Sequence, residues 1–205
     1  MPNQGASING GGPEHIAVLL GRLRLAWLLG RFPSRVIWSI YIFVNGFLTI
    51  ALLALLAVVT GSPFVFPSLG PTVYLLFIAP VQENSSPRDT ILDHAIGLVC
   101  GYGAYALTGA ANVPFGVHPG VYWPRILAAA LSLSATGAFM VLLCADHPPA
   151  GATTRIVSLG ITSKPKELVI IEAAVLILVE QALVINRLAG SPYPLWKYCG
   201  QTETR

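Results

Sequence analysis

The chain alternates long apolar runs with short polar connections, and four of these runs are long enough to cross a membrane. They cover residues 36–60, 90–108, 121–145 and 167–188. A bilayer core needs roughly 20 predominantly apolar residues in helical form. The pattern therefore predicts an all-α, polytopic membrane protein. We expect one small helix bundle, because no polar linker is long enough to separate two domains.

Two further apolar stretches, residues 64–80 and 146–162, are interrupted. The first contains Pro67, Gly70 and Pro71, and the second contains the sequence DHPPAGATT at residues 146–154. Proline cannot continue a helix but is well suited to starting one. Irregular backbone at membrane depth is tolerated only where it is buried in protein or lines a wet cavity. Both stretches are therefore predicted to be broken or re-entrant half-helices, and the second is the leading candidate site.

The two interrupted stretches also resemble each other. Residues 67–72 and 148–153 share the pattern P-x-x-G-x-T, at an offset of 81 residues, and residues 87–89 match 165–167 at an offset of 78. The halves, about 36–109 and 121–188, would each contain three crossing segments and would then lie in opposite orientations. Such inverted repeats, with a broken segment in each half, are typical of transporters that bind their substrate near the midplane.

The two ends of the chain lack the long uncharged apolar runs of this central domain. Residues 1–35 are predicted to hold a disordered Gly/Asn-rich start followed by an amphipathic helix in the membrane interface; a short cytoplasmic helix covering the bundle is the alternative. Arginines precede the first span, which places the N-terminus in the cytoplasm. We expect the membrane to be the plasma (inner) membrane. Residues 189–205 are expected to form a loose tail.

The composition indicates a membrane protein and argues against a nucleic-acid-binding or metal-binding one. Hydrophobic residues make up 54% of the chain and charged residues only 10%, with a net charge of +3. The basic residues lie at segment ends, which suits orientation signals rather than a nucleic-acid surface. The three cysteines, Cys100, Cys144 and Cys199, form no CxxC. We interpret them as small hydrophobic residues, and we expect neither a metal site nor a cofactor.

Helix starts inside a membrane favour anion binding. The first N–H groups of a helix lack partners, and its N-terminus carries roughly half a positive charge. Glycines allow close backbone approach and hydroxyls add donors. The alternative is that these motifs are tight corners of helix packing. The predicted anion-binding residues are Ser68, Gly70, Thr72, His147, Gly151, Thr153 and Thr154.

Ionisable residues within the apolar runs are candidates for proton coupling. In the repeat register His94 falls opposite Glu172, so the two form either a proton-coupling pair or a structural ion pair. His147 either donates to the anion, carries a proton, or caps a helix. Arg155 lines the pathway or pairs with a carboxylate. Gly97 and Gly101 form a GxxxG that predicts close helix packing.

The motifs HPPAGAT, PSLGPTVYLLF and SPRDTILDHAIG resemble the HPP family of integral membrane proteins, over residues 36–188. Family members in plastids and cyanobacteria are associated with nitrite transport or binding. The resemblance therefore implies a transporter of a small inorganic anion, with nitrite favoured. Asp93 departs from the family pattern, which has a small residue such as glycine there.

Two other classes of function remain as alternatives to a transporter. A membrane-embedded enzyme would use His94, Asp146, His147 and Glu172, but the chain has no HExxH or GxSxG motif, so we expect no enzyme. A non-transporting scaffold would pack through its glycine faces. The expected partners are the anion, membrane lipids and further copies of the chain in a homo-oligomer, with no nucleic acid.

Overall fold

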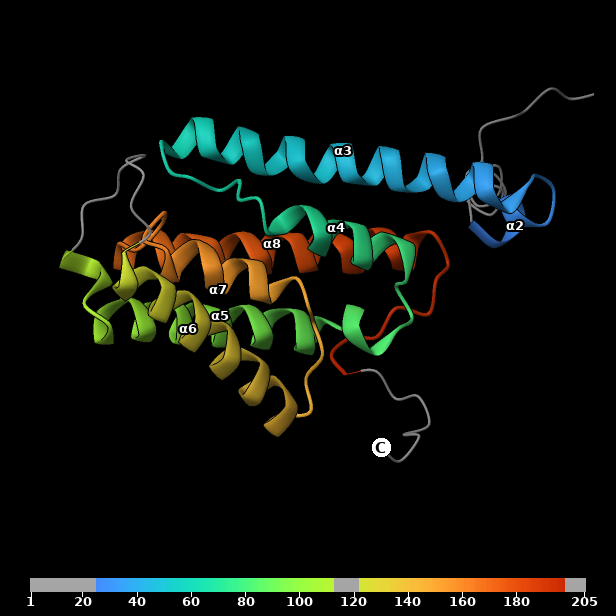
Figure 1. The fold of residues 1–205 in the computed structure, drawn as a ribbon. Helices are drawn as coiled ribbons and strands as arrows, with labels where there is room; N and C mark the ends of the chain where they lie inside the picture. Colours follow the sequence, from blue (N-terminus) through green and yellow to red (C-terminus); the bar gives the residue numbers. More distant parts are fainter. Residues whose placement is uncertain (1–24, 113–121, 198–205) are drawn as a thin grey trace, which may run out of the picture.

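The computed structural model describes residues 25–112 and 122–197 (Figure 1). The predicted disordered start lies outside these residues, as does most of the predicted interfacial helix. Of that helix, α2 covers Leu25–Leu29.

The described residues are helical and contain no strand, which confirms the all-α prediction. Each predicted apolar run forms a helix whose ends lie within a few residues of the expected positions. Two single turns of 3₁₀ helix, Glu83–Ser85 and Ala110–Asn112, flank one of these helices. The helices are α3 (Ser34–Thr60), α4 (Leu69–Ile78), α5 (Pro87–Leu107), α6 (Trp123–Leu142), α7 (Ala150–Ser158) and α8 (Pro165–Leu188).

Among the described residues, α3, α6 and α8 are long and apolar enough to cross a membrane, so the protein is an integral membrane protein. Their outward side chains are largely apolar; Phe43 is 74% exposed and Val141 is 76% exposed. Lipid tails solvate such surfaces without cost. Helix α5, predicted as a span, has 21 residues, but its polar first turns keep it outside this group.

Helices α4 and α7 are short, with 10 and 9 residues. At 1.5 Å per residue they are about 15 Å long, half the thickness of a bilayer core. They start at Leu69 and Ala150, in the register of the P-x-x-G-x-T repeat. The order long, short, long thus occurs twice. In Figure 1 the helices of each corresponding pair, α3 and α6, α4 and α7, and α5 and α8, run in opposite directions. An inverted repeat remains a prediction consistent with this arrangement.

Helix α5 is the centre of the packing, since it contacts α6, α7 and α8. Its GxxxG residues lie against α7. A Cβ added at Gly97 would be 2.7 Å from Thr154 Oγ1, and one added at Gly101 would be 2.8 Å from the Thr154 carbonyl oxygen. Only glycine permits this approach, so the predicted close packing of this motif is present. Helix α4 packs on the other side, between α3 and α8.

The segment after α8 differs from the loose tail expected from residue 189. Tyr193 is fully buried and its hydroxyl donates to the Ser85 carbonyl oxygen at 2.8 Å. The backbone N–H of Arg88 donates to the carbonyl oxygen of Trp196 at 3.0 Å. An aromatic ring with a polar tip suits a buried place where its hydroxyl finds an acceptor, and that acceptor is a backbone carbonyl that the sequence does not reveal. Residues 198–205 lie outside the described chain.

Candidate functional site

The start of α4 carries a buried hydroxyl without a partner. Ser68 is the N-cap residue of this helix, yet its side chain forms no capping hydrogen bond. The residue is fully buried, and Ser68 Oγ has no hydrogen-bond partner among the described residues. Buried polar groups in proteins are almost always hydrogen-bonded. This hydroxyl is therefore available to a bound group.

Thr72, one turn further along α4, joins two histidines. Thr72 Oγ1 lies 3.1 Å from His94 Nε2 and 3.2 Å from His147 Nε2. The same oxygen lies 3.2 Å from the carbonyl oxygen of Ser68. His94 comes from α5 and His147 from the connection between α6 and α7, so Thr72 is the point where both halves of the chain meet.

The far side of each imidazole is also bonded. His94 Nδ1 lies 2.8 Å from Thr153 Oγ1 of α7. His147 Nδ1 lies 2.7 Å from the Asn84 carbonyl oxygen, with Thr90 Oγ1 at 3.4 Å. The ring centroids are 5.3 Å apart. The two short helices are thus linked by a buried chain of hydroxyl and imidazole groups.

His147 lies outside the spanning helices and is fully buried. Burial lowers the pKa of its imidazole from 6.5 to about 4, although the Asn84 carbonyl and the Asp146 carboxylate both raise it. The cause is desolvation, which disfavours the charged imidazolium. His147 is therefore neutral near pH 7.

Asp93 holds the connection between α6 and α7, which contains His147, Pro148 and Pro149. Its Oδ2 accepts the backbone N–H of His147 at 2.6 Å, while Oδ1 is buried without a hydrogen-bond partner among the described residues. The residue that departs from the family pattern thus bonds the backbone of the His-Pro-Pro histidine.

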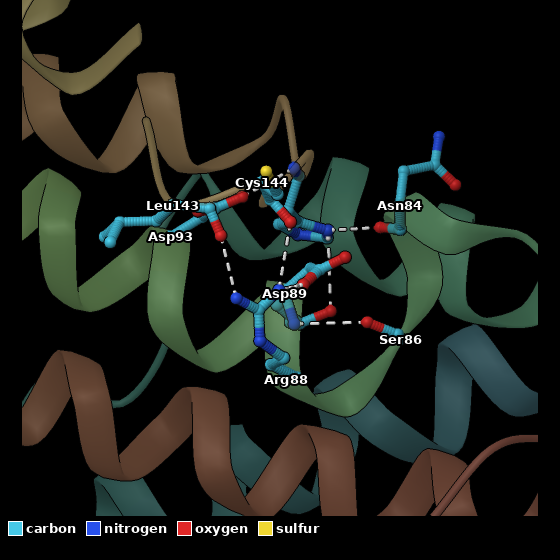
Figure 2. A network of polar contacts seen from close by, with 9 residues as sticks. Asn84, Ser86, Arg88, Asp89, Asp93, Leu143 and Cys144 are labelled. Carbon is cyan, nitrogen blue, oxygen red and sulfur yellow. Dashed lines mark hydrogen bonds and ion pairs between the residues drawn. The ribbon is translucent and has the colours of Figure 1, made fainter. Parts of the chain in front are cut away.

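Arg88 binds the beginning of the same connection, as Figure 2 shows. Its guanidinium donates to the carbonyl oxygens of Leu143 (2.8 Å) and Cys144 (3.0 Å), directly after α6, and forms an ion pair of 2.7 Å with Asp89. A cation at a helix C-terminus satisfies carbonyls that have no helical partner. The guanidinium of Arg88 therefore positions the connection that carries His147.

The first backbone N–H groups of α7 already have partners. The N–H groups of Ala150, Gly151 and Ala152 each donate, at 3.0 Å, to a carbonyl three residues earlier. A Cβ at Gly151 would be 3.2 Å from Leu133 Cδ1, so this glycine faces α6. Thr154 Oγ1 lies 3.0 Å from Thr136 Oγ1 of α6. Gly151 and Thr154 thus serve helix packing in this conformation.

The other predicted residues lie apart from the network. Gly70 is exposed, with open space around it. Arg155 lies at a groove of about 450 Å³ between α6 and α7, together with Arg125. Glu172 lies at a second groove, of about 480 Å³, between α5 and α8, and its Oε2 is buried with no hydrogen-bond partner in the described part of the chain. Within residues 25–112 and 122–197, no hydrogen bond or ion pair joins Glu172 to His94.

Sequence reasoning missed two members of the site. The carbonyl of Asn84 leaves no trace in the residue type, so no pattern could have identified it. Thr90 had a signal, since it lies one turn before His94 on α5. No group of three or more His, Cys, Asp or Glu side chains that could hold a metal ion occurs in the described part of the chain.

These features define a polytopic integral membrane protein with a polar site buried between two interrupted segments. The family model for the HPP transmembrane region matches residues 32–194, so the chain belongs to the HPP family of membrane proteins. Neither a curated protein nor a solved structure matches it.

Proposed function

We propose that the protein transports a small monovalent anion, with nitrite as the favoured substrate. The anion would bind at the start of α4, beside the histidines that link this helix to α7. The proposal also includes a cytoplasmic N-terminus in the plasma (inner) membrane and assembly as a homo-oligomer.

The buried hydroxyl of Ser68 carries this proposal. Leaving a buried polar group without a partner costs about 1–3 kcal/mol. An anion accepting this hydrogen at a helix N-terminus would remove that cost and also gain from the helix dipole. A second copy of the same motif starts α7, and Thr153 of that copy is tied to the network through His94.

The charges around the site suit weak and reversible binding. The nearest arginine, Arg88, is already paired with Asp89 and two carbonyls. An anion would therefore meet dipoles and hydroxyls rather than a free fixed cation. Transport requires a site that releases its substrate as well as binding it. Since Thr72, His94, His147 and Thr153 are all fully buried, loading requires an opening motion, as in an alternating-access carrier.

Nitrite uptake into proteoliposomes tests the function. We expect protein-dependent, saturable uptake above that of empty liposomes, which control for leakage of protonated nitrous acid. Nitrate, formate and chloride serve as competitors and rank the substrates. Absence of protein-dependent flux of any of these anions would contradict the proposal.

Ser68→Ala tests the location. It removes the unpartnered hydroxyl, so we expect roughly tenfold weaker nitrite affinity together with unchanged or higher thermal stability. Thr49→Val is the matched control, because Thr49 is also buried with an unpartnered hydroxyl but lies in α3, outside the site. Equal nitrite affinity in Ser68→Ala and wild type would move the site away from α4.

A further inference from the structure

The tautomer of His147 follows from its partner. A carbonyl oxygen can only accept, so His147 Nδ1, which lies 2.7 Å from the Asn84 carbonyl oxygen, carries the hydrogen. A neutral imidazole has one N–H. His147 Nε2 is therefore an acceptor, and the hydrogen on the 3.2 Å contact comes from Thr72 Oγ1.

This assignment fixes the rest of the chain. Since the Thr72 hydroxyl donates to His147, it must accept from His94 at 3.1 Å, which makes His94 the Nε2–H tautomer. His94 Nδ1 then accepts from the Thr153 hydroxyl at 2.8 Å. The hydrogen bonds thus run in one direction, from Thr153 to the Asn84 carbonyl, and each donor is used once.

The same atoms fit a second arrangement with one more proton. Thr72 Oγ1 also lies 3.2 Å from the Ser68 carbonyl oxygen. If the Thr72 hydroxyl turned its hydrogen to that carbonyl, its oxygen would accept from His94 Nε2–H and from a protonated His147 Nε2–H. A hydroxyl has one hydrogen and two lone pairs, so this arrangement is also fully satisfied.

We propose that His147 is the proton-binding group of this site and that the Thr72 hydroxyl is its switch, turning from His147 Nε2 to the Ser68 carbonyl so that the network holds one more proton with its heavy atoms in the same positions. The inference rests on the proposed function in one respect: the proton accompanies the anion. One proton is taken from solution and forms the N–H bond on Nε2. The hydrogen of Thr72 stays on its oxygen, and the added charge balances that of a monovalent anion.

Most of the charged or titratable groups near His147 belong to α5. Helices α4 and α7 present only the uncharged Ser68, Thr72 and Thr153 to the network. Glu172 of α8, Arg125 of α6 and Arg155 of α7 lie at the separate grooves, and Glu83 of the 3₁₀ turn is exposed. The charged or titratable groups around His147 are His94, Asp93, Asp89 with its partner Arg88, and Asp146.

The burial of His147 makes the two ligands depend on each other. With an empty site its pKa is about 4, so the proton is absent near pH 7. An anion at the start of α4 would favour the imidazolium and raise that pKa. By linkage, the proton would tighten anion binding by the same factor. The site would then load both ligands or neither, which is the behaviour of an electroneutral symporter.

Nitrogen NMR of protein labelled with ¹⁵N-histidine tests the network directly. The chain has four histidines, and a His15→Gln, His118→Gln background leaves only the two of the site. We expect His147 as the Nδ1–H tautomer and His94 as the Nε2–H tautomer at neutral pH. Finding the hydrogen of His147 on Nε2 would overturn the proposal.

The same sample tests the switch. Saturating unlabelled nitrite should raise the titration midpoint of His147 by about one pH unit or more, which corresponds to a tenfold higher affinity for the proton. Thr72→Val should abolish this shift, Thr72→Ser should restore it, and Thr49→Val should leave it unchanged. A midpoint that nitrite does not move would overturn the coupling.

Nitrite exchange between liposome interior and exterior at equal pH separates this inference from the proposed function. Exchange without proton movement during net uptake would overturn the coupling and leave the transporter standing. No exchange at all would overturn the proposed function and with it the accompanying proton, while the tautomers of the two histidines would still test the Thr72 switch.

Discussion

Thr72 shows how a single hydroxyl organises this protein at the scale of one residue. It contacts both buried histidines and a carbonyl of its own helix. A valine would have the same shape but would leave two imidazole nitrogens without partners in a buried place. The hydroxyl therefore matters for which protonation states the site can adopt, beyond any packing role.

The buried histidine predicts an acid sensitivity of the fold. The unfolded imidazole takes a proton near pH 6.5, whereas the folded protein holds His147 neutral down to about pH 4. Its contribution to stability is complete above pH 6.5 and falls as the pH is lowered toward 4, by roughly 3 kcal/mol over the window. We expect His147→Asn to flatten the pH dependence of the unfolding midpoint in detergent over this range. Parallel curves for the variant and the wild type would contradict this.

Residue-level prediction from the sequence reached part of this site. His94, His147, Thr72 and Thr153 were predicted, and the structure brings them together. Adjacent residues on a helix point about 100° apart. Thr154 therefore faces α6 while Thr153 faces His94, and a motif alone does not show which threonine turns inward. Only the packing of α7 decides this.

At the scale of the element, α5 combines site and scaffold. Its first turns carry Asp93 and His94, and its later turns carry the glycines that admit α7. The position of the Thr153 hydroxyl therefore depends on the close contact between its neighbour Thr154 and the two glycines of α5. Close packing and site geometry are linked through the same pair of helices.

Replacing these glycines should separate packing from helix propensity. Alanine favours a helix by up to about 1 kcal/mol over glycine, but at Gly97 and Gly101 its methyl group would meet α7 closer than 3 Å. We expect Gly97→Ala and Gly101→Ala to lower stability by about 1–3 kcal/mol, as overpacking does. Gly103→Ala is the control, because nothing lies within 4 Å there, and it should be neutral or slightly stabilising. Thermal unfolding in detergent measures all three, and equal midpoints would refute the close contact.

The element boundaries could be predicted because proline marks several helix starts. Helices α5 and α8 begin at Pro87 and Pro165, and α7 begins directly after Pro149. The hydrogen bonds from Arg88 to the end of α6 could not be predicted in this way. Its partners are backbone carbonyls of a segment 55 residues away, which have no signature in the sequence. The sequence places Arg88 among the basic residues at segment ends, and the structure adds a contact that positions His147.

At the scale of the whole molecule, the two sets of three helices run in opposite senses (Figure 1). In an inverted repeat the turn before α5 and the start of α8 would face opposite sides of the membrane. The repeat in the sequence predicts this from two short matches, and the paired helix starts agree with it. Neither match identifies the side to which each end is exposed.

Cysteine labelling tests that arrangement. Glu83 and Lys166 are both exposed and lie next to corresponding helix starts. After Cys100, Cys144 and Cys199 have been replaced by serine, we expect Glu83→Cys and Lys166→Cys to react with a membrane-impermeant maleimide from opposite sides of sealed vesicles. Labelling of both from the same side would exclude the inverted repeat. Labelling in permeabilised vesicles controls for reactivity.

The buried Tyr193 has a consequence for how the protein is made. It holds Ser85, the neighbour of the Asn84 carbonyl that selects the tautomer of His147. A ribosome makes the chain from its N-terminus onward, so α3, α6 and α8 are all synthesised before this tyrosine. The hydrogen bond to Ser85 can therefore form only after the last of these helices has been made. We expect a truncation placed before Tyr193 to remove this support from the turn that carries the Asn84 carbonyl.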